Sequence, residues 1–488
     1  MKKIFITVAG GFIARNILRS GVLDKFLASG CEVVLVVTQD KFEYYQKEFS
    51  GSKVRIVGMP LYSNTFIDGF FAFLARNTMR TESVSMLQKS HRQGRKRFFV
   101  YFVKRLLYFL GAFRFFQALV RFGDNQLVRY PAISGFILKE KPDIIFATNV
   151  IENMDIVLLR EARRLGIAIA GMAKSWDNLT NHGVIRVLPP VLIVHNPFLK
   201  MCAMRYHFIP ENRIQIVGIP HYDWYVDSEI LKSPREEFLR NVGLDPAKKF
   251  ILIAGIGDFL APHEWEIAKI INDAIEKGKI GEPVHPVISN SPQADAHVYS
   301  MSNGNFNEAI THRTSNGVNV LFRPHPNFMA NREKITAMKN IKFDDGVAHY
   351  TGAEKGSWEM GKAEIAHLVN SLRYADVVIN IASSMTIDAV AFDRPVICVA
   401  FDGESKEPYW NSVARFYTDF THYKLLTETG GFKLAHSSAE LIQYINDYLK
   451  NPAEDAEGRR KIFAEFIWRL DGHSAERLVN VVLGKYEL

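Results

Sequence analysis

Cysteine is scarce in this chain of 488 residues, which has only three. Cys31, Cys202 and Cys398 are far apart in the sequence, and each stands in an apolar stretch. An odd number of isolated cysteines predicts neither a disulfide framework nor a cysteine metal cluster. We therefore expect reduced thiols and a cytoplasmic protein.

The chain also lacks an uncharged apolar run of the roughly 20 residues that a membrane-spanning helix needs. Its start is apolar, but Gly10 and Gly11 interrupt the run and Arg15 and Arg19 follow. Residues 4–8 therefore predict a first strand instead of a signal peptide. The Gly-Gly turn lacks the full spacing of a dinucleotide fingerprint, so it predicts no cofactor. The turn at Gly10 and Gly11 instead predicts that the backbone comes close to a cleft on the acceptor side.

Short apolar runs alternate with helical periodicity, which is typical of doubly wound α/β domains. The length suits two domains of about 200 residues each. Residues 14–26 and 154–165 predict helices, and residues 222–248 predict a hinge connection. Strands are expected in the first domain at residues 4–8, 32–38, 54–57, 143–147, 167–172, 191–194 and 213–217, and in the second at 249–254, 319–322, 377–381 and 396–401.

The net charge of +8 is concentrated in one segment. Residues 89–129 hold ten basic side chains and a single acidic one, Asp124. On one helix, residues 98–120 would align Phe98, Phe102, Leu106, Phe109, Phe113, Phe116 and Val120 on one face. Residues 95–123 therefore predict either docking on an anionic membrane surface or a helix pair packed into the core. The apolar face and the lack of a recognised module argue against nucleic acid.

Residues 372–402 contain a complete phosphate-binding βα unit. An apolar strand at residues 377–381 is followed by Ser383 and Ser384 at a helix N-cap, with Met385 beginning the helical periodicity. Free backbone N–H groups and two hydroxyls at the end of a strand predict an anion-binding site. Asp388 lies one turn into the helix, close enough to contact a ribose or sugar hydroxyl. An ordinary serine-capped turn is the alternative.

The loop of residues 173–183, A-K-S-W-D-N-L-T-N-H-G, follows a predicted strand where open α/β sheets bind ligands. Trp176 and Asn178 are expected on the acceptor side. Asp177 and His182 are the candidate catalytic bases, because either side chain accepts a proton if its pKa is suitably tuned. We expect burial beneath Trp176 to raise the pKa of Asp177. A solvated turn is the alternative.

The motif R-P-H-P follows the strand at residues 319–322. Its prolines fix the backbone around His325, and Arg323 is a permanent cation suited to phosphate oxygens. Gly257 stands in a second glycine-rich turn that faces the first domain. Asp344 and Asp345 are adjacent in a turn, and we assign them no metal.

The pattern A-D-V-V-I-N-I-A-S-S-M-T-I-D-A-V-A-F-D-R-P-V-I resembles the donor-binding segment of GT-B glycosyltransferases. It is most similar to the branch of CDP-glycerol glycerophosphotransferases and surface or capsular polysaccharide transferases. The resemblance implies two Rossmann-like domains facing a cleft, with the serine pair on the donor diphosphate and the acidic residue of the helix on ribose. It also implies a diphosphate contact for an Arg-X-His-Pro motif, here Arg323 to Pro326. Asp177 replaces the histidine of a family Trp-His pair that supplies the base.

The resemblance also implies that the last helix crosses back to the first domain. We therefore expect an N-terminal acceptor domain of residues 1–225, with a helical insertion at about 60–140, completed by residues 462–488. Residues 232–460 form the expected donor domain. GT-B enzymes generally use helix dipoles and basic residues in place of a cation, so no metal is expected.

These features together predict an inverting, metal-independent glycosyltransferase of cell-envelope polysaccharide synthesis. It would move a sugar or polyol phosphate from a nucleotide-diphosphate donor to a glycan or lipid-linked acceptor, in the cytoplasm or on the inner face of the membrane. A non-hydrolysing nucleotide-sugar 2-epimerase is one alternative, and it would need several carboxylates around the sugar. A non-catalytic, membrane-docked assembly subunit is the other.

Overall fold

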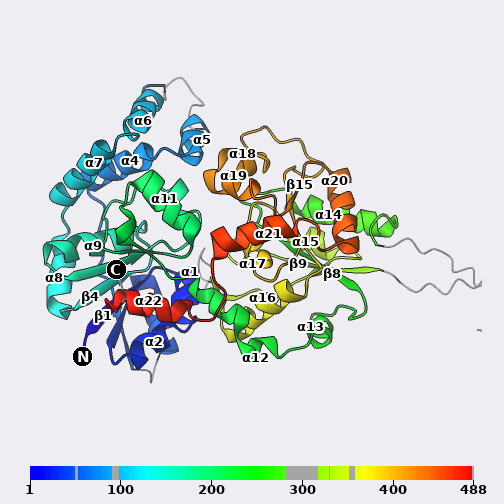
Figure 1. The fold of residues 1–488 in the computed structure, drawn as a ribbon, viewed down its shortest axis with the longest axis horizontal. Coiled ribbons are helices and arrows are strands. Elements are labelled where there is room, and N and C mark those ends of the chain that lie inside the picture. Colours follow the sequence, from blue (N-terminus) through cyan, green and yellow to red (C-terminus); the bar gives the residue numbers. More distant parts are fainter. Residues whose placement is uncertain (50–52, 91–97, 282–316, 329, 351–357, 486–488) are drawn as a thin grey trace, which may run out of the picture.

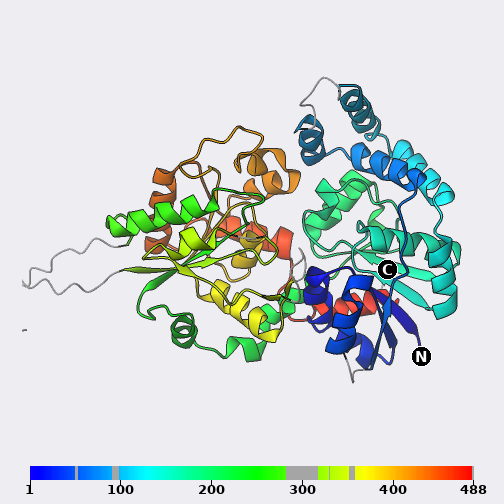
Figure 2. The ribbon, with the colours of Figure 1, turned by 180° about the vertical axis from the view of Figure 1, so that it is seen from behind.

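The computed structural model describes residues 1–49, 53–90, 98–281, 317–328, 330–350 and 358–485. They form two lobes, each a parallel sheet with helices packed on it (Figures 1 and 2). The apolar runs of the sequence are buried strands, as expected where helices cover both faces of a sheet. Residues 278–319 are rich in Asn, Ser, Pro and His, which predicts long loops, and most of this tract lies outside the described residues.

The sheet of the first lobe has the strand order β3-β2-β1-β4-β5-β6-β7. All seven predicted strands are confirmed, within two residues at each end. They are β1 (Lys3–Val8), β2 (Glu32–Val37), β3 (Val54–Gly58), β4 (Ile144–Ala147), β5 (Ala168–Met172), β6 (Leu192–Val194) and β7 (Ile214–Ile216). Their helices include α3 (Phe42–Glu48), α9 (Asn153–Arg164), α10 (Asn178–Asn181) and α11 (Pro197–His207).

The sheet of the second lobe has the order β10-β9-β8-β13-β14-β15. The four predicted strands are present, and the two edge strands, of two and three residues, were too short to show a periodicity in the sequence. The strands are β8 (Lys249–Ala254), β9 (Val318–Arg323), β10 (Lys342–Phe343), β13 (Val377–Asn380), β14 (Val396–Val399) and β15 (Lys433–Ala435). The helices are α12 (Ser228–Leu231), α13 (Arg235–Asn241), α14 (Glu264–Glu276), α15 (Arg332–Thr336), α16 (Lys362–Tyr374), α17 (Met385–Val390), α18 (Arg415–Asp419), α19 (Thr421–Thr427), α20 (Ser438–Lys450) and α21 (Ala456–Ile462).

Each sheet has one point at which the strand order reverses, between β1 and β4 in the first lobe and between β8 and β13 in the second. Open α/β sheets bind ligands at such points, beyond the carboxyl ends of the strands. Here both points border one cavity, since Phe12 and Asn149 line it from the first lobe and Gly255 and Ser383 from the second. The topology therefore brings two ligand-binding edges together.

The prediction of one continuous helix at residues 14–26 is wrong. The chain forms a short turn α1 (Gly11–Ile13), a π-helix η1 (Ala14–Leu18) and a separate helix α2 (Val22–Ala28). Gly21, whose φ is +81°, separates the last two because such a backbone angle suits glycine and interrupts a right-handed helix.

The aromatic insertion is also divided. Its helices are α4 (Phe66–Thr78), α5 (Glu82–Ser90), α6 (Phe98–Leu110), α7 (Arg114–Leu127) and α8 (Pro131–Glu140), so the single helix expected at residues 98–120 is corrected to two. The chain turns at Gly111, where any β-carbon would lie 1.7 Å from the carbonyl oxygen of Thr78. The insertion projects from the first lobe (Figure 1).

A buried ionic cluster fastens this insertion to the first lobe. Arg186 contacts Asp68 of α4 and Asp124 of α7, both at 2.8 Å, and Arg160 of α9 contacts Asp124 at 2.8 Å. Two cations and two carboxylates balance inside the core, which is the condition under which buried charge is tolerated. Removing any one of the four would leave an uncompensated buried charge.

The last helix, α22 (Ser474–Val482), packs against α2 of the first lobe, whereas α21 lies on the second (Figure 1). The carboxylate of Asp223, in the 3-10 helix η5 (Pro220–Val226), accepts hydrogen bonds from the amides of Ser474 and Ala475. This carboxylate therefore satisfies the first free amides of the helix. Within the described residues, no helix combines the length and apolar character needed to cross a bilayer.

Candidate active site

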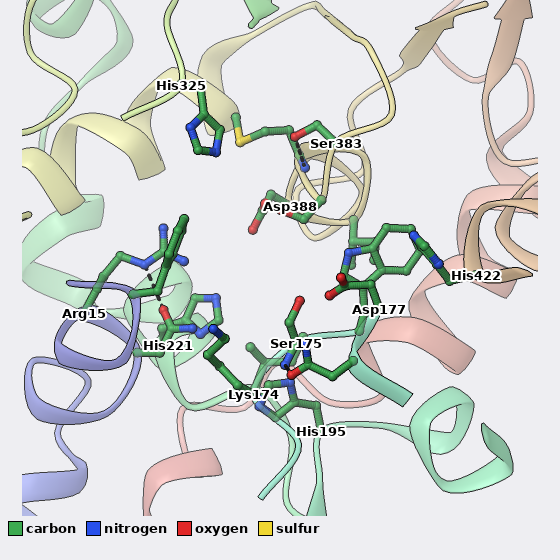
Figure 3. A pocket seen from close by; sticks show the side chains of 18 of the residues that line it. Arg15, Lys174, Ser175, Asp177, His195, His221, His325, Ser383, Asp388 and His422 are labelled. Carbon is green, nitrogen blue, oxygen red and sulfur yellow. Dashed lines mark hydrogen bonds between the residues drawn. The ribbon is translucent and has the colours of Figure 1, made fainter. Parts of the chain in front are cut away.

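A cavity of about 500 Å³ lies between the lobes, lined by residues of both (Figure 3). Most of the predicted catalytic, donor-side and acceptor-side residues contribute to its wall: Trp176, Asp177, Asn178, His182, Arg323, His325, Ser383, Ser384, Met385 and Asp388. Gly10, Gly11 and Gly257 do not line it, although their sequence neighbours Phe12 and Ile256 do. These glycines shape the turns behind the wall.

The serine turn after β13 is held in place by its own polar groups. The amide of Ser383 donates to Asn380 Oδ1 at 3.2 Å, and Ser383 Oγ accepts from the amide of Met385 at 3.3 Å. Ala382 adopts a φ of +39°, and its amide donates to the hydroxyl of Tyr417 at 2.7 Å. Ser384 is exposed, and its hydroxyl has no partner among the described residues. Ser384 therefore presents a free hydroxyl to the cavity, and the O–H of Ser383, whose oxygen only accepts among the described residues, can donate as well.

The R-P-H-P motif follows β9 on the same side of the cavity. Arg323 is buried, and its Nη1 lies 3.0 Å from Oδ2 of Asp344, which also contacts Nε2 of His367. The charge of Arg323 is therefore already partly compensated. Burial lowers the pKa of His325 to about 4, so this ring is neutral near pH 7. Its Nδ1 accepts a hydrogen bond from the amide of Asn327, which leaves Nε2–H as the donor.

Asp388 is shared between the lobes. Its Oδ1 accepts a hydrogen bond of 2.6 Å from the hydroxyl of Tyr225, which belongs to η5. Burial raises the pKa of Asp388, against the opposing effect of this hydrogen bond. The carboxylate also interacts with the hydroxyl of Tyr222, and Asp388 lines the cavity.

The loop after β5 brings Trp176, Asp177 and His182 to the opposite wall. The ring of Trp176 packs edge-on against His422 at 4.6 Å and Tyr423 at 4.8 Å, both of the second lobe. Asn178 Oδ1 accepts the amide of Ser175 and so closes the loop. His182 Nε2 lies 3.7 Å from Asp177 Oδ2.

The expected pKa of Asp177 is wrong in direction. Burial does act to raise it, as predicted, but the interactions with His182, His422 and Ser175 outweigh burial and hold the pKa well below its usual range. The sequence suggested that Trp176 covers Asp177, but it did not show that two imidazoles converge on this carboxylate. A carboxylate with a depressed pKa is a weak base, whereas it can orient and stabilise a neighbouring imidazolium.

Sequence reasoning missed further polar wall residues, among them Arg15, Asn149, Lys174, His195, His221 and His422. Asn149 and His195 are buried, and Asn149 Oδ1 has no hydrogen-bond partner within the described part of the chain. Burial lowers the pKa of His195 to about 4. Asn149, Lys174 and His195 lie within two residues of the end of a strand, at the carboxyl edge of the sheet. That position was the one signal that could have found them.

The turns behind the wall need glycine. A β-carbon at Gly11 would lie 2.5 Å from the carbonyl oxygen of Trp358, on the short strand β12 (Trp358–Glu359), which pairs with β11 (His349–Tyr350). Gly257 has a φ of +91°, and its amide donates to the buried carboxylate of Glu264 at 2.9 Å. Both glycines thus allow close approach of backbone, one of them across the lobes.

The model of the CDP-glycerol:poly(glycerophosphate) glycerophosphotransferase family matches residues 171–484. The chain belongs to this family. The match includes the loop of Asp177, the R-P-H-P motif and the serine turn, and it confirms the resemblance on which the sequence analysis relied. Family membership supports a transferase. No curated protein matches the chain.

Solved structures confirm the GT-B architecture of this glycerophosphotransferase family member. A Listeria monocytogenes protein assigned to the UDP-N-acetylglucosamine 2-epimerases superposes with a TM-score of 0.54 and 12% identity, over 100% of this chain and 97% of its own. The UDP-GlcNAc 2-epimerase of Neisseria meningitidis, bound to UDP-GlcNAc, gives a TM-score of 0.52 and 11% identity, over 99% and 100%. At such identities the likeness is one of fold alone.

Among the described residues, no group of three or more His, Cys, Asp or Glu side chains is arranged to hold a metal ion. Asp344, which the sequence placed beside Asp345, is engaged with Arg323 and His367 instead.

Proposed function

We propose that this protein transfers a sugar or polyol phosphate from a nucleotide-diphosphate donor to a hydroxyl of a glycan or lipid-linked acceptor. The observation that supports it most is the cavity itself. Its second-lobe wall carries the serine turn, His325 and Asp388, and its first-lobe wall carries the pair of Asp177 and His182. A donor and a proton acceptor would thus face each other across one cavity.

His182 is the proposed general base, with Asp177 as its partner. The imidazole takes the proton of the acceptor hydroxyl, while the carboxylate holds the ring and stabilises its cationic form. On the other side, Ser384 and His325 donate to oxygens of the departing phosphate, where charge accumulates as the bond breaks. Asp388 would accept a hydrogen bond from ribose. A single base favours inversion when a sugar is transferred.

The leaving group identifies the transferred group. Transfer of a sugar breaks the bond between sugar carbon and oxygen and releases a nucleoside diphosphate, whereas transfer of a polyol phosphate breaks the diphosphate and releases a monophosphate. Incubation with CDP-glycerol, UDP-GlcNAc and other donors, with and without a glycan primer, should therefore release one nucleotide in proportion to primer extension. We expect no change with EDTA.

Two results would contradict this proposal. Conversion of the nucleotide sugar at its C2 carbon without any primer would instead favour a 2-epimerase, the fold of which this chain shares. Binding of CDP, UDP, GDP and dTDP that is undetectable by calorimetry would favour a non-catalytic subunit.

We also propose that the insertion docks on an anionic membrane surface. Large apolar side chains of α6 and α7 stand in solvent, among them Phe98, Phe109 and Phe122, each more than 60% exposed. Phe102, Leu106 and Phe113 of the predicted stripe are exposed too, while Val120 packs inward. Such an apolar surface is unusual on a protein that meets only water.

The charges around this surface fit anionic lipid. Arg114 and Arg129 are exposed, whereas Arg121 is turned inward onto the carbonyl oxygens of Ile185 and His207. The basic residues 92 and 95–97 lie outside the described residues. Each surface cation near anionic lipid contributes about 1 kcal/mol, screened over about 10 Å.

Vesicle sedimentation tests the docking. Phosphatidylglycerol vesicles should bind the wild type, less at high salt, and neutral phosphatidylcholine vesicles should bind it weakly. Phe102→Ser with Phe109→Ser should abolish binding, while Leu138→Ser, an exposed apolar position on α8, should not. Equal binding of the double variant and the wild type would contradict the proposal.

A further inference from the structure

The charge around the proposed donor site is supplied unequally by the two lobes. Among the described residues that line the cavity, the Lys and Arg side chains are Arg15, Lys174 and Arg323. Arg323 is engaged with Asp344 at 3.0 Å, and His325 is neutral because burial lowers its pKa to about 4. The second lobe therefore offers a nucleotide diphosphate hydroxyls and a neutral imidazole but no uncompensated cation from this set.

Arg15, from the first lobe, is such a cation. Within the described residues it forms no ion pair, and its Nε donates to Asn16 Oδ1 at 2.8 Å, which leaves its two terminal nitrogens without a partner. Its guanidinium packs over the ring of Phe12, 5.5 Å from the ring centre. The same ring lies 6.3 Å from the imidazole of His325, which belongs to the second lobe. Figure 3 shows Arg15 on the side of the cavity where His325 and His221 lie.

Two contacts between the lobes fix the segment that carries Arg15. Phe12 packs edge-on against Trp358 at 4.6 Å. Arg19, at the end of η1, forms an ion pair of 2.7 Å with Glu359, a carboxylate with no solvent exposure that also accepts the hydroxyl of Tyr45. Arg15 lies between these two anchors. Its guanidinium is therefore positioned against the second lobe before any ligand binds, which limits the entropy lost on binding.

We propose that Arg15 is a donor-binding residue of the first lobe, which pairs with a phosphate oxygen of the nucleotide diphosphate bound on the second lobe. The assignment rests on the proposed function and names the cation that this donor requires. Its planar fork can hold two oxygens at once, which suits a phosphate. The donor then contacts both lobes, and its charge holds them together around the acceptor.

Lys174 provides the matched control. It also lines the cavity without an ion-pair partner among the described residues, and its Nζ lies 6.0 Å from the centre of the Phe12 ring. It follows β5, however, and belongs to the loop of Asp177 on the acceptor side. Lys174→Gln removes the same charge from the same cavity but leaves Arg15 in place.

Calorimetry with CDP and UDP, and with cytidine and uridine, tests the assignment. Loss of a charge-assisted contact corresponds to about 10- to 100-fold in affinity. Arg15→Gln should therefore weaken binding of the better diphosphate by about 10- to 100-fold and leave the nucleoside within about twofold. Arg15→Lys should lose less, and Lys174→Gln should stay within about threefold. The affinity of Arg15→Gln should also depend less on salt.

Each outcome of this experiment supports or refutes the assignment of Arg15. If Arg15→Gln binds the diphosphate as tightly as the wild type, or if Lys174→Gln loses as much, Arg15 is not the donor cation. An equal loss for nucleoside and diphosphate, or an unfolded Arg15→Gln together with an Arg15→Lys variant of normal affinity and normal salt dependence, also refutes it. If the wild type binds neither CDP nor UDP, the same titrations are made with GDP and dTDP, and a wild type that binds none of the four contradicts the proposed function itself, and this assignment with it.

Discussion

Replacing Asp177 by Asn tests whether it is the base or the partner of the base. The two side chains are 3.7 Å apart, and 29% of Asp177 and 51% of His182 are exposed. At that distance a unit charge pair is worth about 1 kcal/mol in water and about 4 kcal/mol at an effective dielectric constant of 20. Such exposure places the interaction near the lower value, about 1–2 kcal/mol.

If Asp177 only stabilises the His182 imidazolium, Asp177→Asn should lower kcat by about 5- to 30-fold. His182→Ala removes the base and should lower kcat by about 10² to 10⁴-fold. Neither variant should change donor affinity by calorimetry, because neither residue lies on the wall proposed to bind the donor. Release of nucleotide from the donor that turns over, at saturating primer, measures kcat.

Rescue gives an independent readout. His182→Gly leaves space for free imidazole, which should restore part of the rate, while Asp177→Asn should not respond to it. An Asp177→Asn variant slower than His182→Ala, together with near-normal turnover in the His182 variants, would refute the reasoning and make Asp177 the base.

Three further predictions concern other parts of the molecule. Ser383→Ala and Ser384→Ala should each weaken binding of CDP or UDP by about 1–2 kcal/mol, because each hydroxyl can donate to a phosphate oxygen; unchanged affinity of either variant by calorimetry would contradict this. Arg323→Lys should lower the free energy of unfolding, since one ammonium cannot replace the fork held by Asp344, and an unchanged urea midpoint would count against it. Burial raises the pKa of the fully buried Asp155 to about 7, so its protonated form favours folding and its contribution to stability falls as the pH rises from about 4 to 7. Asp155→Asn should therefore raise the melting temperature more at pH 8 than at pH 5, and the same difference at both would exclude the effect.

The order of elements and the serine turn were predictable because they depend on short segments. A strand buried on both faces needs an apolar run, and a βα turn that exposes amides needs small polar residues such as Ser383 and Ser384. Such requirements appear at adjacent positions in the sequence. The two sheets, their strands and the turn after β13 follow from them.

Tertiary packing decided what adjacent residues could not show. The pKa of Asp177 falls because the imidazole of His422, 245 residues away in the chain, converges on it with that of His182. The helix expected at residues 98–120 divides because Gly111 meets the backbone of Thr78. The segment that carries Arg15 is held beside the cavity by contacts with Trp358 and Glu359 of the other lobe. Charge and packing act between residues that are close in space, and distance along the chain does not limit them.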